Sequence, residues 1–221
     1  MEPRRILGLD AALSRASIAI LDGEEVATRR DFDGPHGVAE TLPVAASECL
    51  AEAGLATGDL DAIAVSIGPG SFTGLRASIA LAQGLGFASG MPVHGISLTE
   101  AFMAAMPDIG GRTLWIAVTA RRGRIFLERE GRAEAFPDEG VPRPEGPVAL
   151  AGDRAIRVAA RLAARGHDVM LTGLRYPDAA RVALAARARI LSGLPPRPAA
   201  PLYVDPPEAK LPAGRSSPAA A

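Results

Sequence analysis

The sequence predicts an α/β fold with a mixed sheet that is covered by helices. Two short apolar runs open the chain, a run of polar alternation typical of a half-exposed strand follows over 24–33, and Asp22-Gly23 before it is a strong hairpin signal. Because short turns join neighbouring strands, we expect these three strands to be antiparallel neighbours. Helix and strand patterns alternate after them, which indicates strands added in parallel through helical connections. With 48% hydrophobic residues among 221, the chain can bury a core of this kind.

The individual elements follow from hydrophobic spacing and from caps and turns. In the first half we expect strands over 5–10, 17–21 and 24–33, a helix over 38–53, a strand over 61–67, a helix over 75–89, a strand over 93–96, and a helix from the capping box at 97–100 to about 106. In the second half we expect strands over 113–118, 124–128 and 168–171 and helices over 155–164 and 179–191. The chain then divides into a first lobe over 1–105, a second lobe over 106–205, and a disordered Pro/Ala-rich tail over 206–221.

Rare residue types exclude several kinds of site. Cys49 is the only cysteine, so an intrachain disulfide and a multi-cysteine zinc site are excluded. The only lysine is Lys210 in the tail, so there is no Walker-type phosphate loop. His36, His94 and His167 are far apart in the sequence, and we expect no metal site. The sequence has neither a signal-peptide pattern nor the roughly 20 apolar residues of a membrane span, so we expect a cytoplasmic protein that does not bind membranes.

The charge is distributed unevenly along the chain. Residues 1–100 carry 6 arginines against 13 acidic residues, whereas residues 101–221 carry 18 basic against 12 acidic residues. The simpler interpretation is two solvated surfaces of opposite sign. The alternative is that the second half faces an anionic partner. Trp115 and the arginines at 121, 122 and 124 resemble a nucleic-acid patch only weakly, because a lone tryptophan in an apolar strand is usually a core residue.

The most informative segment is a glycine-rich turn between a predicted strand and a predicted helix. Its residues are Gly68, Pro69, Gly70, Ser71, Phe72, Thr73, Gly74, Leu75 and Arg76. Ser71 or Thr73 is expected to cap the helix, so the favoured interpretation is a tight turn with an N-cap. Phosphate binding at the exposed N–H groups of the helix start is the alternative.

The helix after this turn is unusually rich in small residues, including interior glycines that each cost about 1 kcal/mol relative to alanine. Close packing on the chain's own sheet is one explanation. The functional alternative is a seam for a helix of another subunit, formed together with the preceding helix. The residues assigned to this seam are Val38, Leu42, Ala45, Cys49, Leu75, Ser78, Ile79, Ala82 and Gly86.

Two further polar residues are candidates for chemistry, and each has a simpler explanation. Asp10 ends the first strand, where a carboxylate could hold a metal–nucleotide complex, but a surface carboxylate is favoured because Ala11 and Ala12 supply no hydroxyl. His36 is expected to be an exposed loop or cap residue. A Gly-x-Ser-x-Gly elbow is absent, so we expect no catalytic residues of the serine-hydrolase kind.

These motifs resemble the bacterial TsaB (YeaZ-type) family. The resemblance rests on residues 6–10 and 17–21, on the specific run Gly-Pro-Gly-Ser-Phe-Thr-Gly-Leu-Arg at 68–76, on 82–86, and on 92–101. It covers the first hundred residues well and continues more weakly at 120–126 and 201–204.

The resemblance implies a two-lobed actin/Hsp70-like ATPase fold with a shortened second lobe. It also implies a non-catalytic subunit of the machinery that makes N6-threonylcarbamoyladenosine at position 37 of tRNAs that decode ANN codons. In that family a TsaD-type paralogue carries the metal and the transfer chemistry, and a TsaE-type ATPase joins the pair. The TsaB-type subunit pairs with the paralogue, or with itself when alone, through its first two helices.

This chain departs from the family pattern at three places. Ala11 and Ala12 replace the usual hydroxyls, Gly37 follows His36 in place of serine, and Thr119 replaces the aspartate before Ala120. We therefore expect no tightly bound cofactor, with ATP and magnesium only in the assembled complex, and contact with tRNA only through that complex. The competing hypothesis is a small ATPase or phosphotransferase that uses Asp10 and the glycine-rich turn.

Overall fold

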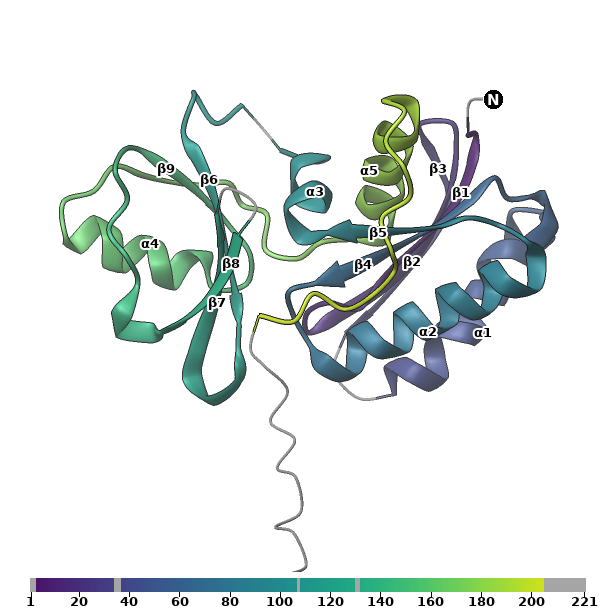
Figure 1. Ribbon diagram of the computed structural model, residues 1–221, viewed down its shortest axis with the longest axis horizontal. Coiled ribbons are helices and arrows are strands. Elements are labelled where there is room, and N and C mark those ends of the chain that lie inside the picture. The colour runs from purple at the N-terminus through teal and green to yellow at the C-terminus, as the bar shows by residue number, and fades with distance from the viewer. Residues whose placement is uncertain (1–2, 34–36, 107, 130–131, 205–221) are drawn as a thin grey trace, which may run out of the picture.

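The computed structural model describes residues 3–33, 37–106, 108–129 and 132–204. These residues form two five-stranded mixed sheets with helices packed on their faces (Figure 1). The first sheet contains β1 (Arg5–Asp10), β2 (Arg15–Asp22), β3 (Glu25–Asp33), β4 (Ala62–Gly68) and β5 (Val93–Ser97). The second contains β6 (Thr113–Thr119), β7 (Arg124–Arg129), β8 (Arg132–Pro137), β9 (Val148–Ala151) and β10 (Val169–Leu171).

The helices connect and follow these strands. They are α1 (Val38–Glu52), α2 (Phe72–Ser89), α3 (Leu98–Met103), α4 (Ala155–Ala164) and α5 (Ala179–Leu191), with short 3-10 turns at Thr57–Asp59, Arg121–Gly123 and Asp138–Gly140. Ser97 and Glu100 form the expected capping box at the start of α3. The expected helices and strands are therefore confirmed. The strands β8 and β9 were not expected from the sequence.

The two sheets share one strand order. The first runs β3-β2-β1-β4-β5 and the second runs β8-β7-β6-β9-β10, each with an antiparallel meander followed by two parallel strands. The second lobe is the shorter repeat, because a 3-10 turn and a loop over residues 138–147 stand where α1 stands in the first. This arrangement confirms the predicted α/β fold with two lobes and a shortened second lobe.

The first sheet is buried on both faces. Leu7, Leu9 and Ile18 pack toward α1 and α2, while Ile6 and Leu21 pack toward α5 and α3. This alternation follows the two-residue period of a strand. Figure 1 shows α1 and α2 side by side on one face and α5 with α3 on the other.

The end of the chain packs on the first lobe rather than on the second. Helix α5 lies against β1, β2 and β4, so closely that a Cβ on Gly8 would fall 2.1 Å from the carbonyl oxygen of Ala179. Residues 195–204, which we call the C-terminal strap, then run along β5, where Gly95 N donates to Arg197 O over 2.9 Å (Figure 1). The expected second lobe over 106–205 is therefore wrong at its end, because residues 179–204 complete the first lobe. The expected tail over 206–221 lies outside the described residues.

Candidate functional site

The glycine-rich turn packs directly on the turn between β1 and β2. Ser71 N donates to the carbonyl oxygen of Ala12 over 2.6 Å. A Cβ on Gly70 would lie 2.0 Å from that oxygen, and one on Gly74 would lie 2.2 Å from the carbonyl oxygen of Ala11. The glycines therefore allow two backbone segments to approach each other more closely than side chains would permit.

The start of α2 follows the favoured interpretation. Ser71 caps the helix, since its Oγ accepts from Gly74 N over 3.2 Å, whereas Thr73 is exposed and does not cap. Pro69 is buried, and Leu75 is 3% exposed. The backbone of the turn packs on the carbonyl groups of Ala11 and Ala12, and Ser71 caps the helix, as the tight-turn interpretation expects.

Asp10 is not the surface carboxylate that the sequence favoured. Its side chain is 1% exposed, because the β1–β2 turn is covered by the glycine-rich turn. Burial raises the pKa of Asp10 to about 6, although the N–H of Ala12, 3.3 Å from Oδ1, stabilises the charged form. Asp10 is therefore held inside the fold and not at its surface.

The residues assigned to the partner seam lie in this chain's own core, which corrects that assignment. The exposed fraction does not exceed 4% for any of Leu42, Ala45, Cys49, Leu75, Ser78, Ile79 and Ala82, and Gly86 is also buried. Only Val38 is half-buried. The spacing of these residues marks the faces of α1 and α2 that pack on the first sheet. Cys49 is a free thiol, and burial raises its pKa.

Gly86 illustrates the reason for this packing. A Cβ at this position would fall 2.4 Å from Cγ2 of Val93 on β5 and 3.0 Å from the carbonyl oxygen of Met91. The small residue is therefore required for close contact with the chain's own sheet. Gly84, only two positions earlier, has nothing within 4 Å of an added Cβ. Close packing within the chain does not explain it.

The opposite faces of α1 and α2 carry exposed apolar side chains, and we call them together the outer helix face. Phe87 on α2 is 95% exposed, and Val44 on α1 is 57% exposed. Arg76 is the only charged residue of the eighteen in α2. Hydrophobic spacing in the sequence does not indicate on which side of α2 Phe87 lies.

The remaining candidate residues lie as follows. Ala11 and Ala12 are buried, Thr119 is exposed and hydrogen-bonded to Asp153, and Ala120 is 7% exposed. Trp115 is a core residue at 4% exposure, as predicted. His36 lies outside the described residues.

The described residues lack two features that would indicate other classes of function. None of them form a cluster of three or more histidine, cysteine, aspartate or glutamate side chains suited to a metal ion. In the same part of the chain, no helix has the length and apolar character needed to span a membrane.

Comparisons with known proteins agree with this fold. A family model described as "TsaD: tRNA N6-adenosine threonylcarbamoyltransferase" matches residues 36–166. The chain is 32% identical over 141 residues to the tRNA threonylcarbamoyladenosine biosynthesis protein TsaB of Haemophilus influenzae, covering 63% of this chain and 59% of that protein. The TsaB protein of Escherichia coli is 30% identical over 147 residues, with 64% and 63% covered. The chain thus matches about three fifths of the length of these two relatives.

A solved structure extends the likeness to nearly the whole fold. The structure of YeaZ from Pseudomonas aeruginosa matches with a TM-score of 0.71 at 26% sequence identity, covering 90% of this chain and 99% of that one.

Proposed function

We propose, from the premise that this chain belongs to the TsaD (tRNA N6-adenosine threonylcarbamoyltransferase) family and is of the TsaB (YeaZ) type within it, that it is a subunit of the machinery that makes threonylcarbamoyladenosine in tRNA. In this proposal the chain is a non-catalytic scaffold that pairs with a TsaD-type paralogue. The paralogue transfers the threonylcarbamoyl group to N6 of adenosine 37 in tRNAs that decode ANN codons. A TsaE-type ATPase joins the pair, and the chain pairs with itself when alone.

The observation that carries this proposal is the outer helix face. A phenylalanine that is 95% exposed gains nothing from the fold of this chain, but burial against a partner contributes about 1.5–3 kcal/mol. Gly84, one turn before Phe87, leaves room for a partner backbone to approach α2 closely. Exposed apolar surface that the fold does not require is typical of a protein–protein interface.

The proposal of a non-catalytic role is supported by the surroundings of Asp10. In the competing ATPase hypothesis Asp10 and the glycine-rich turn would hold the phosphates, yet the side chain is 1% exposed and the turn is packed against Ala11 and Ala12. We therefore propose that the isolated chain binds no nucleotide tightly, and that ATP and magnesium are held only within the assembled complex. Calorimetric titration with Mg-ATP that gives a saturable heat, lost in Asp10→Ala, would favour the ATPase.

The pairing is tested with one glycine substitution and a matched control. Gly84→Arg places a charged side chain on the outer helix face, and Gly146→Arg makes the same change in a loop of the second lobe; both positions have open space around an added Cβ. Size-exclusion chromatography after co-expression with the TsaD-type partner should show that Gly84→Arg abolishes co-elution and Gly146→Arg does not. Both variants should keep the circular dichroism spectrum of the folded chain. Undiminished co-elution of Gly84→Arg would overturn the proposed pairing.

The same change at Ala82, a residue that the sequence analysis assigned to the seam, is unsuitable as a test of pairing. Ala82 is 0% exposed, so an arginine there would bury an unpaired charge and disrupt the packing of α2 on its own sheet. Loss of co-elution in this variant would then reflect misfolding rather than a lost interface.

A further inference from the structure

An arginine–aromatic cluster lies where three distant segments of the chain meet. It comprises Phe72 and Arg76 at the start of α2, Arg121 between β6 and β7, and Tyr203 at the end of the C-terminal strap. The Cζ atoms of Arg76 and Arg121 lie 3.7 Å and 4.9 Å from the centroid of the same Phe72 ring. The two guanidinium groups are therefore no farther apart than the sum of these distances.

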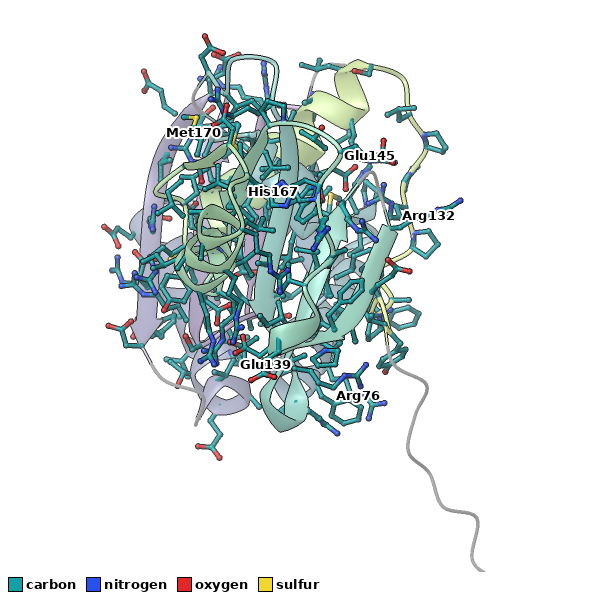
Figure 2. All side chains as sticks on the ribbon, turned by 90° about the vertical axis from the view of Figure 1, so that its left-hand side faces the viewer. Arg76, Arg132, Glu139, Glu145, His167 and Met170 are labelled. Carbon is teal, nitrogen blue, oxygen red and sulfur yellow. The ribbon has the colours of Figure 1, made fainter. Side chains whose placement is uncertain are left out.

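Arg76 has part of its hydrogen-bonding capacity in use. Its Nε and Nη2 donate to the Tyr203 hydroxyl over 3.1 Å and 2.9 Å, and Nη1 has no hydrogen bond within the described part of the chain. Arg121 contacts the Phe72 ring and is exposed. Figure 2 shows Arg76 at the lower end of the molecule, well below Arg132. Both arginines thus have N–H groups available to an incoming acceptor.

Elsewhere this chain places a carboxylate between two neighbouring arginines. Asp138 pairs with both Arg157 and Arg161, the latter over 2.6 Å, and Glu100 pairs with one arginine from α5 and one from the C-terminal strap. Around Phe72, by contrast, neither arginine forms an ion pair with any residue that the structure describes. Two cations held at one ring without a carboxylate repel each other, and an external anion removes that cost.

We propose that the arginine–aromatic cluster binds RNA, with Arg76 and Arg121 contacting backbone phosphate and the Tyr203 ring stacking on a base. The inference rests on the proposed function, and it assigns to this chain a direct contact with the tRNA. Arginine forms bidentate hydrogen bonds with phosphate, and single-stranded RNA bases stack on exposed aromatic rings and on guanidinium planes.

The aromatic rings favour RNA over an acidic protein segment. Tyr203 is 53% exposed and Phe72 is 40% exposed, so both present ring surface that carboxylate side chains would not use. The charge of the chain agrees, because the half that contributes Arg121 and Tyr203 has an excess of six positive charges over residues 101–221. The cluster lies at the first turn of α2, where residues of the second lobe and of the C-terminal strap reach the helix.

Binding is measured by fluorescence anisotropy with a fluorescein-labelled anticodon stem–loop RNA, using the full chain alone and the co-expressed pair. The decisive variant is Arg121→Ala, because Arg121 is exposed and, among the described residues, has no hydrogen bond or ion pair that the substitution would break. Its matched control is Arg132→Ala, an exposed arginine of β8. We expect Arg121→Ala to weaken binding about tenfold at low salt and to lower the slope of log affinity against log salt by about one. Arg132→Ala should change affinity less than about twofold, as expected for an exposed charge remote from the site.

Three results would overturn the proposal: equal affinity of Arg121→Ala and wild type, equal losses in Arg121→Ala and Arg132→Ala, or a fluorescein-labelled hexaglutamate peptide that binds as tightly as the RNA. Tyr203→Leu should also weaken RNA binding while leaving the salt slope unchanged. The pairing is measured separately in the same preparations: Arg121→Ala should still co-elute with the TsaD-type partner, and isolated Gly84→Arg should still bind RNA. A failure of the RNA contact is thereby distinguished from a failure of the proposed function.

Discussion

Two glycines in the same helix should respond oppositely to the same substitution. Replacing Gly84 by alanine adds a methyl group with nothing within 4 Å, so the helix gains the propensity difference, about 1 kcal/mol of unfolding free energy. Replacing Gly86 adds a methyl group 2.4 Å from Val93 Cγ2, and such overpacking costs about 1–3 kcal/mol. The two positions share helix, chemistry and neighbours in sequence, so their difference isolates the packing of α2 on β5.

Urea denaturation followed by circular dichroism measures both effects, and a thermal melt should show shifts of about 3 °C per kcal/mol for a chain of this size. A Gly84→Ala variant that is less stable than wild type, or a Gly86→Ala variant that is as stable, would refute the argument. The same variants also bear on pairing. If a partner backbone approaches α2 at Gly84, then Gly84→Ala stabilises the isolated chain and at the same time weakens its affinity for the TsaD-type partner.

Three further substitutions give distinct signatures. Phe87→Ala should leave the unfolding free energy unchanged, since the side chain is 95% exposed, and weaken pairing by about 2 kcal/mol, or about 30-fold in Kd by calorimetry; an unchanged Kd would exclude Phe87 from the interface. Asp10→Asn should stabilise the chain at pH 8 and have little effect at pH 4. The pKa of Asp10 is about 6 in the folded chain against 3.8 in the unfolded chain, so the free energy of unfolding falls as the pH rises between these values, by at most about 3 kcal/mol. Equal melting shifts at both pH values would contradict this. Glu100→Gln keeps the capping box but loses both arginine ion pairs, and should lower the free energy of unfolding by about 1–2 kcal/mol in urea titrations. Added salt should lower the stability of the wild type and so reduce its difference from the variant.

The sequence predicts well the elements whose signals are local. The hairpin at Asp22-Gly23, the cap at Ser71 and the capping box at Ser97 each fix an element boundary through two to four neighbouring residues, and the structure has all three. The mixed strand order follows in turn, because short turns force a meander and helical connections force parallel pairs.

The sequence does not predict features that depend on contacts between residues far apart in the chain. The strand β9, over 148–151, is only four residues long and becomes a strand by pairing with β6 and β10. The placement of α5 depends on the fit between Gly8 and Ala179, which are 171 positions apart. Two signals in the sequence point to this contact. One is Gly8 within an otherwise apolar strand, and the other is an alanine-rich helix over 179–191, whose small side chains permit close packing.

Periodicity also failed to separate the inner and outer faces of α1 and α2. Both faces of α2 are apolar, so hydrophobic spacing finds the core face and gives no polar face by which to recognise the other. The two interior glycines appeared equivalent for the same reason. Only the surroundings of each Cβ show that Gly86 serves the chain's own sheet and that Gly84 does not.

The repeated topology bears on which pairings are compatible. Within the described residues the second lobe has no counterpart of α1, so each chain offers one pair of helices, α1 with α2, in this position. A two-fold pairing through the outer helix face uses the same residues in both partners, and a paralogue of the same fold can take the place of a second copy. Self-pairing and pairing with a TsaD-type partner are therefore mutually exclusive if both use Phe87. In either pair the arginine–aromatic cluster, which includes Arg121 of the second lobe, lies at the opposite end of α2 from Phe87, about 22 Å away along the helix, so RNA can contact it without displacing the partner.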